Sequence, residues 1–246
     1  MFSEALRGFV PFSFSHWIAW VTLAVALALL FRFRRRVTPR LDRFIRIGLV
    51  ALMLGLEWTF YGWMASTGRL DASLLPFGLC AMSLYLTCAV LITGHRRLFR
   101  IVFPWAIAGA LISLLVADMD YRFPHFRFIH YFTNHSLFLW ANLYILFVWD
   151  IRITYRDVLA SSIVLSALAL LMVGINAMLG TNHLFLNELP EDVAPAYALF
   201  GTFWPLAFAV SIFILFNVIY VPLGIRNRKM ARLQQIEDAV RFEAAH

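Results

Sequence analysis

The stretch VLASSIVLSALALLMVGINAML, residues 158–179, contains no charged side chain. About 20 consecutive apolar residues are enough for a helix to cross the hydrocarbon core of a bilayer, so this stretch predicts a transmembrane helix. Six further long apolar runs occur, and Glu57 is the one charged residue within them. They cover residues 8–31, 47–68, 72–94, 101–117, 128–149 and 193–225. We therefore expect an all-α, polytopic membrane protein, a bundle of seven transmembrane helices.

The composition of the 246-residue chain agrees with this class. Hydrophobic residues make up 62% and charged residues only 14%, against roughly 25% charged in an ordinary globular domain. Two cysteines are too few for a disulfide scaffold or a cysteine-rich zinc module. The chain also lacks a phosphate loop, a nucleophile elbow and a dinucleotide fingerprint. We expect no cofactor and no metal site.

The basic residues predict the orientation. If the N-terminus lies outside and the runs alternate, seventeen of the 21 Lys and Arg residues fall in inner segments and four in outer ones. Cytoplasmic loops are enriched in Lys and Arg, so we expect the N-terminus outside and the C-terminus in the cytoplasm of a multi-pass protein of the cell inner membrane. The net charge of +7 is then a signal of topology, and nucleic acid is not expected as a partner. Residues 1–225 form the transmembrane domain in this interpretation, and residues 226–246 a cytoplasmic polar tail.

Polar side chains within the apolar runs carry the functional information, because hydrocarbon makes them costly. Glu57 lies in the middle of its run, where an ionised group costs roughly 2.5–3.5 kcal/mol on insertion scales. Tyr61 follows four residues later, on nearly the same helix face. In run 72–94, Cys80, Ser83 and Thr87 share a face. Such polar stripes turn toward the interior of a bundle rather than toward lipid.

The later runs repeat this pattern. His135 and Asn142 are seven residues apart, within about 20° around a helix, and Asn176 lies near the outer end of run 158–179. Asn182 and His183 follow in the loop directly above it. Because these side chains gather in the outer half of the bundle, we expect a pocket that opens outward or into the outer leaflet.

Each polar residue also has a purely structural explanation. Cys80 can be a small apolar residue in a helix interface, and Glu57 can be protonated and hydrogen-bonded to Tyr61. For Asn142 we favour an interhelical hydrogen bond without further function. His130 and His135 lie about 140° apart around a helix, which makes it difficult for them to bind one metal ion together.

Three segments resemble the YwaF family of small polytopic membrane proteins. They are LLPFGLC at residues 74–80, HYFTNH at 130–135 and NAMLGTNHLFL at 176–186. The resemblance covers most of the chain from the second run onward, with Gly78 where the family often has histidine. Eukaryotic relatives look like lipid acyltransferases with an intramembrane Cys/His pair. The resemblance therefore implies that Cys80 is the nucleophile and His135 the base.

Our leading hypothesis is an integral-membrane acyltransferase or lipid hydrolase that acts on a lipid ester, with membrane lipids as its partners. The alternative is a small-molecule or lipid binding or transport protein that uses the same pocket, and a third interpretation is a structural subunit. The expected catalytic residues are Cys80 and His135. The expected substrate-binding residues are Glu57, Tyr61, Ser83, His130, Asn176, Asn182 and His183.

Overall fold

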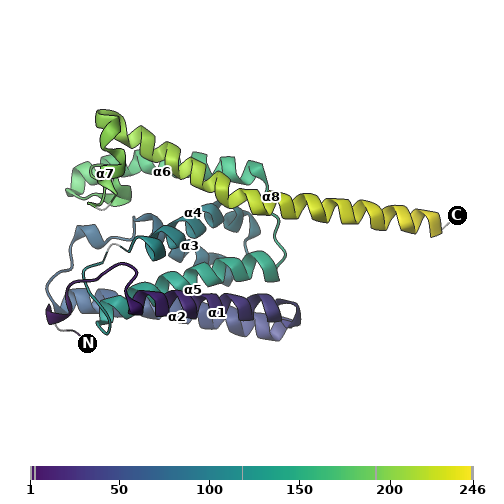
Figure 1. The fold of residues 1–246 in the computed structure, drawn as a ribbon, viewed down its shortest axis with the longest axis horizontal. Coiled ribbons are helices and arrows are strands. Elements are labelled where there is room, and N and C mark those ends of the chain that lie inside the picture. Colours follow the sequence, from purple (N-terminus) through teal and green to yellow (C-terminus); the bar gives the residue numbers. More distant parts are fainter. Residues whose placement is uncertain (1, 3, 118, 192, 245–246) are drawn as a thin grey trace.

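A computed structural model describes residues 2, 4–117, 119–191 and 193–244, and these residues are mostly helical (Figure 1). They contain no β-strand, so the predicted all-α class is confirmed. The α-helices are α1 (Phe14–Phe33), α2 (Pro39–Ser66), α3 (Leu79–Thr93), α4 (Arg96–Leu115), α5 (Phe126–Val148), α6 (Tyr155–Leu179), α7 (Ala194–Tyr197) and α8 (Trp204–Ala244). Short 3-10 helices precede or connect them: η1 (Glu4–Leu6), η2 (Arg34–Arg36), η3 (Ala72–Leu74), η4 (His183–Phe185) and η5 (Ala198–Phe203).

Local sequence sets several helix ends. Thr38 caps α2 by accepting a hydrogen bond from the backbone N–H of Leu41, and Pro39 occupies the first helical position. Thr154 and Asp157 form a capping box at the start of α6. Helices α3 and α6 both end on a left-handed glycine, Gly94 and Gly180, because a residue without Cβ adopts positive φ without strain.

Five elements in the described part of the chain are long and apolar enough to cross a membrane. They are Phe14–Arg36, Pro39–Ser66, Arg96–Leu115, Tyr155–Leu179 and Ala194–Asp238. Helix α3 is apolar but shorter, and the 23-residue α5 carries histidines and asparagines that lower its hydropathy. Those polar side chains are largely buried within the bundle, where they do not meet lipid. The multi-pass class is thus confirmed, and the count of seven spans stays a prediction.

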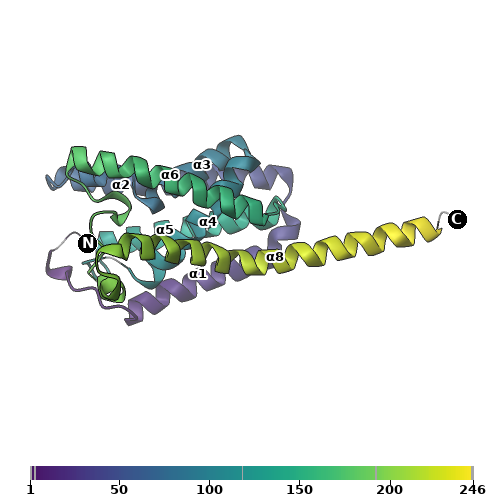
Figure 2. The same ribbon diagram turned by 90° about the horizontal axis from the view of Figure 1, so that it is seen from above.

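Helix α4 lies at the centre of the bundle and packs against α3, α5, α6 and α8. Trp105 of α4 donates to the carbonyl of Ser161 on α6 over 3.2 Å, and the Ser161 hydroxyl donates back to the carbonyl of Ile101 over 2.8 Å. Helix α8 lies beside α6 and α4 and then continues past the bundle (Figures 1 and 2). Helices α6 and α8 therefore lie on one side of α4, away from α1 and α2 (Figure 1).

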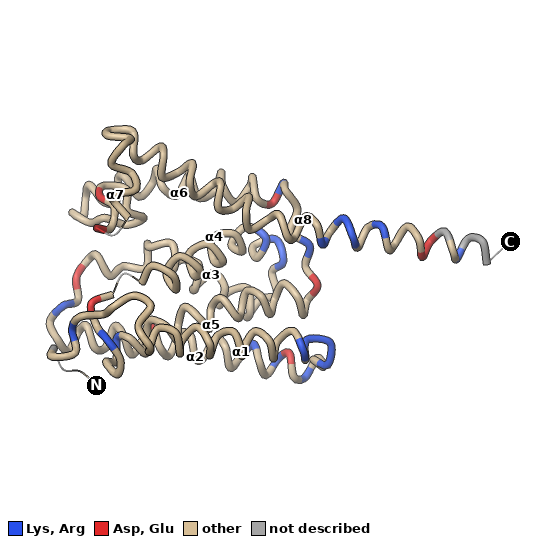
Figure 3. Tube along the Cα trace, in the orientation of Figure 1, with Lys and Arg blue, Asp and Glu red and all other residues tan. Residues whose placement is uncertain are grey.

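The basic residues gather at one end of the bundle. Figure 3 shows Lys and Arg at the turns after α1, α3 and α5 and along the extension of α8, with fewer at the opposite end. This distribution is typical of a protein with that end in the cytoplasm. Helix α8 runs without a break through residue 226, so the proposed boundary between domain and tail falls inside one helix, and residues 245–246 lie outside the described part.

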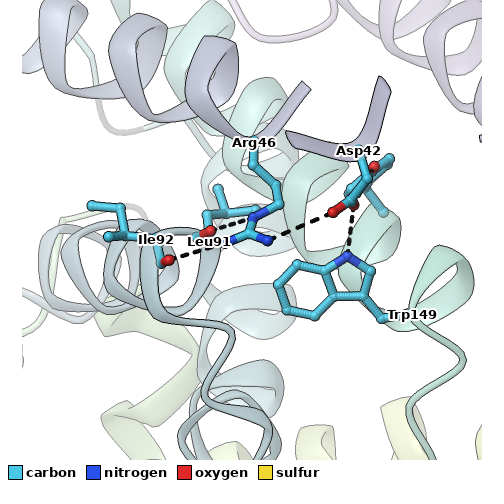
Figure 4. Close-up of polar contacts among 6 residues, drawn as sticks. Asp42, Arg46, Leu91, Ile92 and Trp149 are labelled. Atoms are coloured by element: carbon cyan, nitrogen blue, oxygen red, sulfur yellow. Dashed lines mark hydrogen bonds and ion pairs between the residues drawn. The ribbon is translucent and has the colours of Figure 1, made fainter. Parts of the chain in front are cut away.

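A polar cluster holds three helices together at this basic end (Figure 4). Arg46 of α2 donates to the backbone carbonyls of Leu91 and Ile92, which belong to the last turn of α3. Asp42, one turn earlier on α2, accepts from Trp149 over 2.8 Å and from Tyr144 over 2.7 Å. The last carbonyls of a helix lack intrahelical partners, so Arg46 both satisfies them and fixes α3 to α2.

Candidate functional site

Cys80 lies in the first turn of α3, where that helix meets α4. Its Sγ is 3.4 Å from the hydroxyl oxygen of Ser113 on α4. Gly109, one turn away on α4, faces the same thiol, and a Cβ at that position would lie only 3.0 Å from Sγ. The absence of a side chain at Gly109 therefore makes room for the thiol.

His135 lies half-buried on α5, and its Nδ1 is 2.8 Å from the carbonyl oxygen of Tyr131 in the preceding turn. A carbonyl only accepts hydrogen bonds, so Nδ1 carries the proton and Nε2 is left as the acceptor. The Tyr131 ring lies against the imidazole, with ring centroids 4.3 Å apart. Its hydroxyl donates to the carbonyl of Ser113 over 3.0 Å. Cys80 and His135 thus contact two different residues, Ser113 and Tyr131, and the hydrogen bond from Tyr131 to Ser113 links those two.

Glu57 is held by a residue that the sequence interpretation did not select. Asn134 of α5 donates its side-chain N–H to Glu57 Oε1 over 2.6 Å, which joins α5 to α2. The guanidinium of Arg127 lies within electrostatic range of this carboxylate. The same guanidinium lies 3.0 Å from Nδ1 of His130, and it stacks over the Phe60 ring at 4.5 Å. Glu57 and His130 therefore share one polar neighbourhood between α2 and α5.

Tyr61 lines a cavity with a volume of about 420 Å³. Its hydroxyl donates to the carbonyl of Leu74 over 2.7 Å, and Tyr85 of α3 lines the same cavity. Asp71 lies at the same cavity in the loop between α2 and α3. Hydrogen bonds from the backbone and hydroxyl of Ser73 lower the pKa of the Asp71 carboxyl.

The remaining polar face of α3 packs against α5. Ser83 is fully buried, and within the described structure its hydroxyl has no hydrogen-bond partner. One turn further, Thr87 accepts a 3.0 Å hydrogen bond from Asn142. This is the interhelical bond that we favoured for Asn142.

Residues 176–186, the third segment that resembles the YwaF family, cover the end of α6 and a loop that is held by its own hydrogen bonds. Asn176 accepts hydrogen bonds from the Thr181 hydroxyl and the His183 backbone, and it donates to the His183 carbonyl. Asn182 is exposed and donates to the carbonyl of Glu188 over 2.7 Å. His183 alone reaches the start of α3, with its ring 5.3 Å from that of Phe77. Asn176 and Asn182 therefore bond to their own loop, while His183 adjoins the segment before Cys80.

Nothing in the described ranges groups three or more His, Cys, Asp or Glu side chains in a way that could hold a metal ion. The polar neighbourhood is built from α2, α3, α4 and α5. Four residues of this neighbourhood were not among those predicted from the sequence. They are Ser113, Tyr131, Asn134 and Tyr85. Of these, only Asn134 could have been predicted from the sequence, because it lies one turn after His130 in a polar segment.

Long apolar helices with polar side chains turned toward one another define a multi-pass membrane protein. A sequence model of the TMEM164 family matches residues 11–222, and the chain belongs to this family. Comparison with curated proteins found no match, and comparison with solved structures found none. The relation to the YwaF family, the link to acyltransferases and the inner-membrane location are not part of the family match and stay predictions.

Proposed function

We propose that this protein is an integral-membrane acyltransferase or lipid hydrolase, with Cys80 as nucleophile and His135 as base. One observation carries the proposal. Contacts lead from the Cys80 thiol to Ser113, from the Ser113 carbonyl to the Tyr131 hydroxyl, and from the Tyr131 carbonyl to His135. The two reacting side chains therefore belong to one polar network across α3, α4 and α5, within otherwise apolar helices.

The network supports a two-step acyl transfer. His135 Nε2 accepts the thiol proton, and the Cys80 thiolate attacks the carbonyl carbon of a lipid ester. The ester C–O bond breaks, the leaving alcohol takes the proton from His135, and a thioester remains on Cys80. A second alcohol, or water in a hydrolase, then attacks the thioester, giving its proton back through His135 to the departing thiolate.

Two features of the site fit this chemistry. The Nδ1–H bond to Tyr131 keeps His135 in the tautomer whose Nε2 can act as base. The first backbone N–H groups of α3 have no acceptor within the helix, so they can donate to the oxyanion formed at Cys80. The mechanism requires His135 Nε2 to approach Sγ when the lipid binds, since catalytic hydrogen bonds often tighten only in the substrate complex.

Capture of the acyl-enzyme tests the proposal. The full-length protein in phospholipid nanodiscs is incubated with phosphatidylcholine that carries an alkyne-tagged acyl chain. We expect a covalent label on Cys80 that neutral hydroxylamine releases, because it cleaves thioesters. Cys80→Ala should lose the label, and Cys88→Ala, which changes a buried packing cysteine, should keep it.

His135→Gln probes the base separately and should slow labelling by about 10²–10⁴-fold. Turnover by Cys80→Ala at the wild-type rate would overturn the proposal. So would a label that forms on Cys80 equally fast without His135.

A further inference from the structure

Two arginines from distant parts of the chain meet at one aromatic ring at the basic end of the bundle (Figure 3). The guanidinium of Arg34 in η2 lies 5.5 Å from the centroid of the Phe147 ring, and that of Arg226 in α8 lies 5.1 Å from the same centroid. The two guanidiniums are therefore at most about 11 Å apart, close to one Debye length, so their charges repel each other. Both side chains are half-buried, which weakens the screening of this repulsion by salt.

The ion pairs in the described part of the chain leave positive charge over at this ring. Arg226 pairs with Asp150, whose side chain is 61% exposed. Arg34 pairs with no Asp or Glu among the described residues, and the two residues after it are also arginines, both exposed. The contacts with Phe147 are favourable but supply no negative charge. The excess positive charge therefore attracts an anion.

The position of the two arginines favours a lipid as the source of that anion. The apolar span that contains α1 and η2 ends at Arg36, so Arg34 lies where this span leaves the hydrocarbon. Arg34 also stacks over Phe31 at 5.6 Å, and Phe31 packs edge to face on Phe147 with ring centroids 5.0 Å apart. Phe31 and Phe33 are both substantially exposed. The cations thus adjoin an aromatic surface that can contact acyl chains.

We infer that Arg34 and Arg226 together bind the head group of a phospholipid with a net negative charge. The planar N–H groups of both guanidiniums donate to the phosphate oxygens, a geometry that arginine matches better than lysine. Arg226 uses one nitrogen for Asp150 and keeps other N–H groups for the phosphate. The acyl chains lie along Phe31 and Phe33. Basic pockets between spans at the membrane surface are typical sites for anionic head groups.

This site is separate from the proposed acyl transfer. Cys80 lies in the first turn of α3, whereas the last turn of that helix is fixed to α2 at the basic end. The two sites are therefore at opposite ends of the bundle. Lipid binding at Arg34 does not depend on Cys80.

Photo-crosslinking of the full-length protein in phosphatidylcholine nanodiscs at physiological ionic strength tests the inference. Two phospholipid probes carry the same acyl chain with a diazirine and a terminal alkyne, and they differ only in having a glycerol or a choline head. We expect the phosphatidylglycerol probe to label residues 27–36 about tenfold more, because the arginines repel the choline ammonium. Equal labelling by the two probes would overturn the inference. So would complete protection by millimolar inorganic phosphate, which would assign the site to a soluble anion.

Matched variants identify Arg34. Arg34→Gln should lower labelling by the phosphatidylglycerol probe about tenfold, because a charge-assisted hydrogen bond to the phosphate is lost. Arg97→Gln removes the same charge at an exposed position of the basic end, and it should label as the wild type does. Cys80→Ala should also label normally, which separates this site from acyl transfer. An equal loss in Arg34→Gln and Arg97→Gln would mean general attraction by the basic end and would contradict a site at Arg34.

Asp150→Asn tests the part of Arg226. The substitution removes the carboxylate that competes with the phosphate for this guanidinium, so labelling by the phosphatidylglycerol probe should rise. Asp157→Asn is the control, because Asp157 caps α6 through Thr154 and removes the same charge away from the Phe147 ring. If labelling rises no more in Asp150→Asn than in this control, Arg226 does not bind the head group.

Discussion

The side-chain amide of Asn134 donates a 2.6 Å hydrogen bond to Glu57, and this bond links α5 to α2 within an apolar bundle. Asn134 is buried, and Glu57 is half-buried. In apolar surroundings, a polar group left without its hydrogen-bond partner costs more free energy than a solvent-exposed hydrogen bond contributes. The pair therefore stabilises the packing of these two helices on each other.

Asn134→Leu tests this link. The substitution keeps the approximate volume and removes the donor, so we expect the free energy of unfolding to fall by about 1–3 kcal/mol. Asn217→Leu is the matched control, because the Asn217 side chain donates to the carbonyl of Phe213 in its own helix and does not link two helices in the described part of the chain. The control should change stability by less than about 0.5 kcal/mol. Denaturant unfolding in detergent micelles measures both, and equal losses would contradict a special role for the pair.

Arg46→Lys should loosen the basic end of the bundle. An ammonium cannot reproduce the planar arrangement with which the guanidinium reaches the carbonyls of both Leu91 and Ile92. We expect a loss of about 1–2 kcal/mol in stability and faster proteolysis of the turn between α3 and α4. Arg43→Lys, at an exposed position on the same helix, is the control and should leave both unchanged. Unaltered proteolysis in Arg46→Lys would show that the carbonyl contacts do not hold this turn.

Hydropathy predicted where most helices lie because the apolar character of a span is a local property of the sequence. It did not predict their ends. Helix α4 begins at Arg96, five residues before the apolar run, since basic side chains at its start can leave the hydrocarbon while the backbone stays helical. The last run is broken at Gly201, whose φ of 50° interrupts the helix before α8 begins at Trp204.

The candidate site was less predictable, because a helix face gives a direction but not the neighbouring helix in that direction. His135 and Asn142 share a face of α5, yet Asn142 bonds to Thr87 on α3 while His135 bonds to Tyr131 on its own helix. Asn134 and Ser113 became meaningful only when the packing placed Glu57 and Cys80 beside them. Asn176 looked like part of a pocket, but it stabilises its own loop.

Asn176→Ala should release that loop. The side chain makes three hydrogen bonds to residues 181 and 183, and Ala removes all of them. Limited proteolysis should then cut residues 180–191 several times faster than in the wild type. Asn176→Asp keeps the acceptor oxygen and loses only the donor, so it should give an intermediate rate. Cleavage at the wild-type rate in Asn176→Ala would argue against control of the loop by this carboxamide.

Reporter fusions test the orientation. We expect the end of α8, which carries Arg226, Arg228, Lys229 and Arg232, to lie in the cytoplasm, and a break after residue 68 to lie outside. Green fluorescent protein should therefore fluoresce at the first position and alkaline phosphatase should be active at the second. The opposite pattern would reverse the orientation. Equal behaviour at the two positions would mean an even number of crossings between them and would contradict seven spans.

The contact between Cys80 and Gly109 can be measured with a double-mutant cycle. Ala is favoured over Gly in a helix by up to about 1 kcal/mol. Gly55→Ala on α2 places its new Cβ in open space, so it should raise the free energy of unfolding by part of this amount.

Gly109→Ala should gain less or lose stability, because its Cβ would lie 3.0 Å from the Cys80 thiol and force that thiol away from Ser113. In a Cys80→Ala background there is no sulfur to displace, so Gly109→Ala should recover the gain seen at residue 55. The two substitutions are then coupled by at least about 0.5 kcal/mol. Additive effects would mean that the thiol does not occupy the space beside Gly109, and the connection from Cys80 through Ser113 toward His135 would lose its first contact.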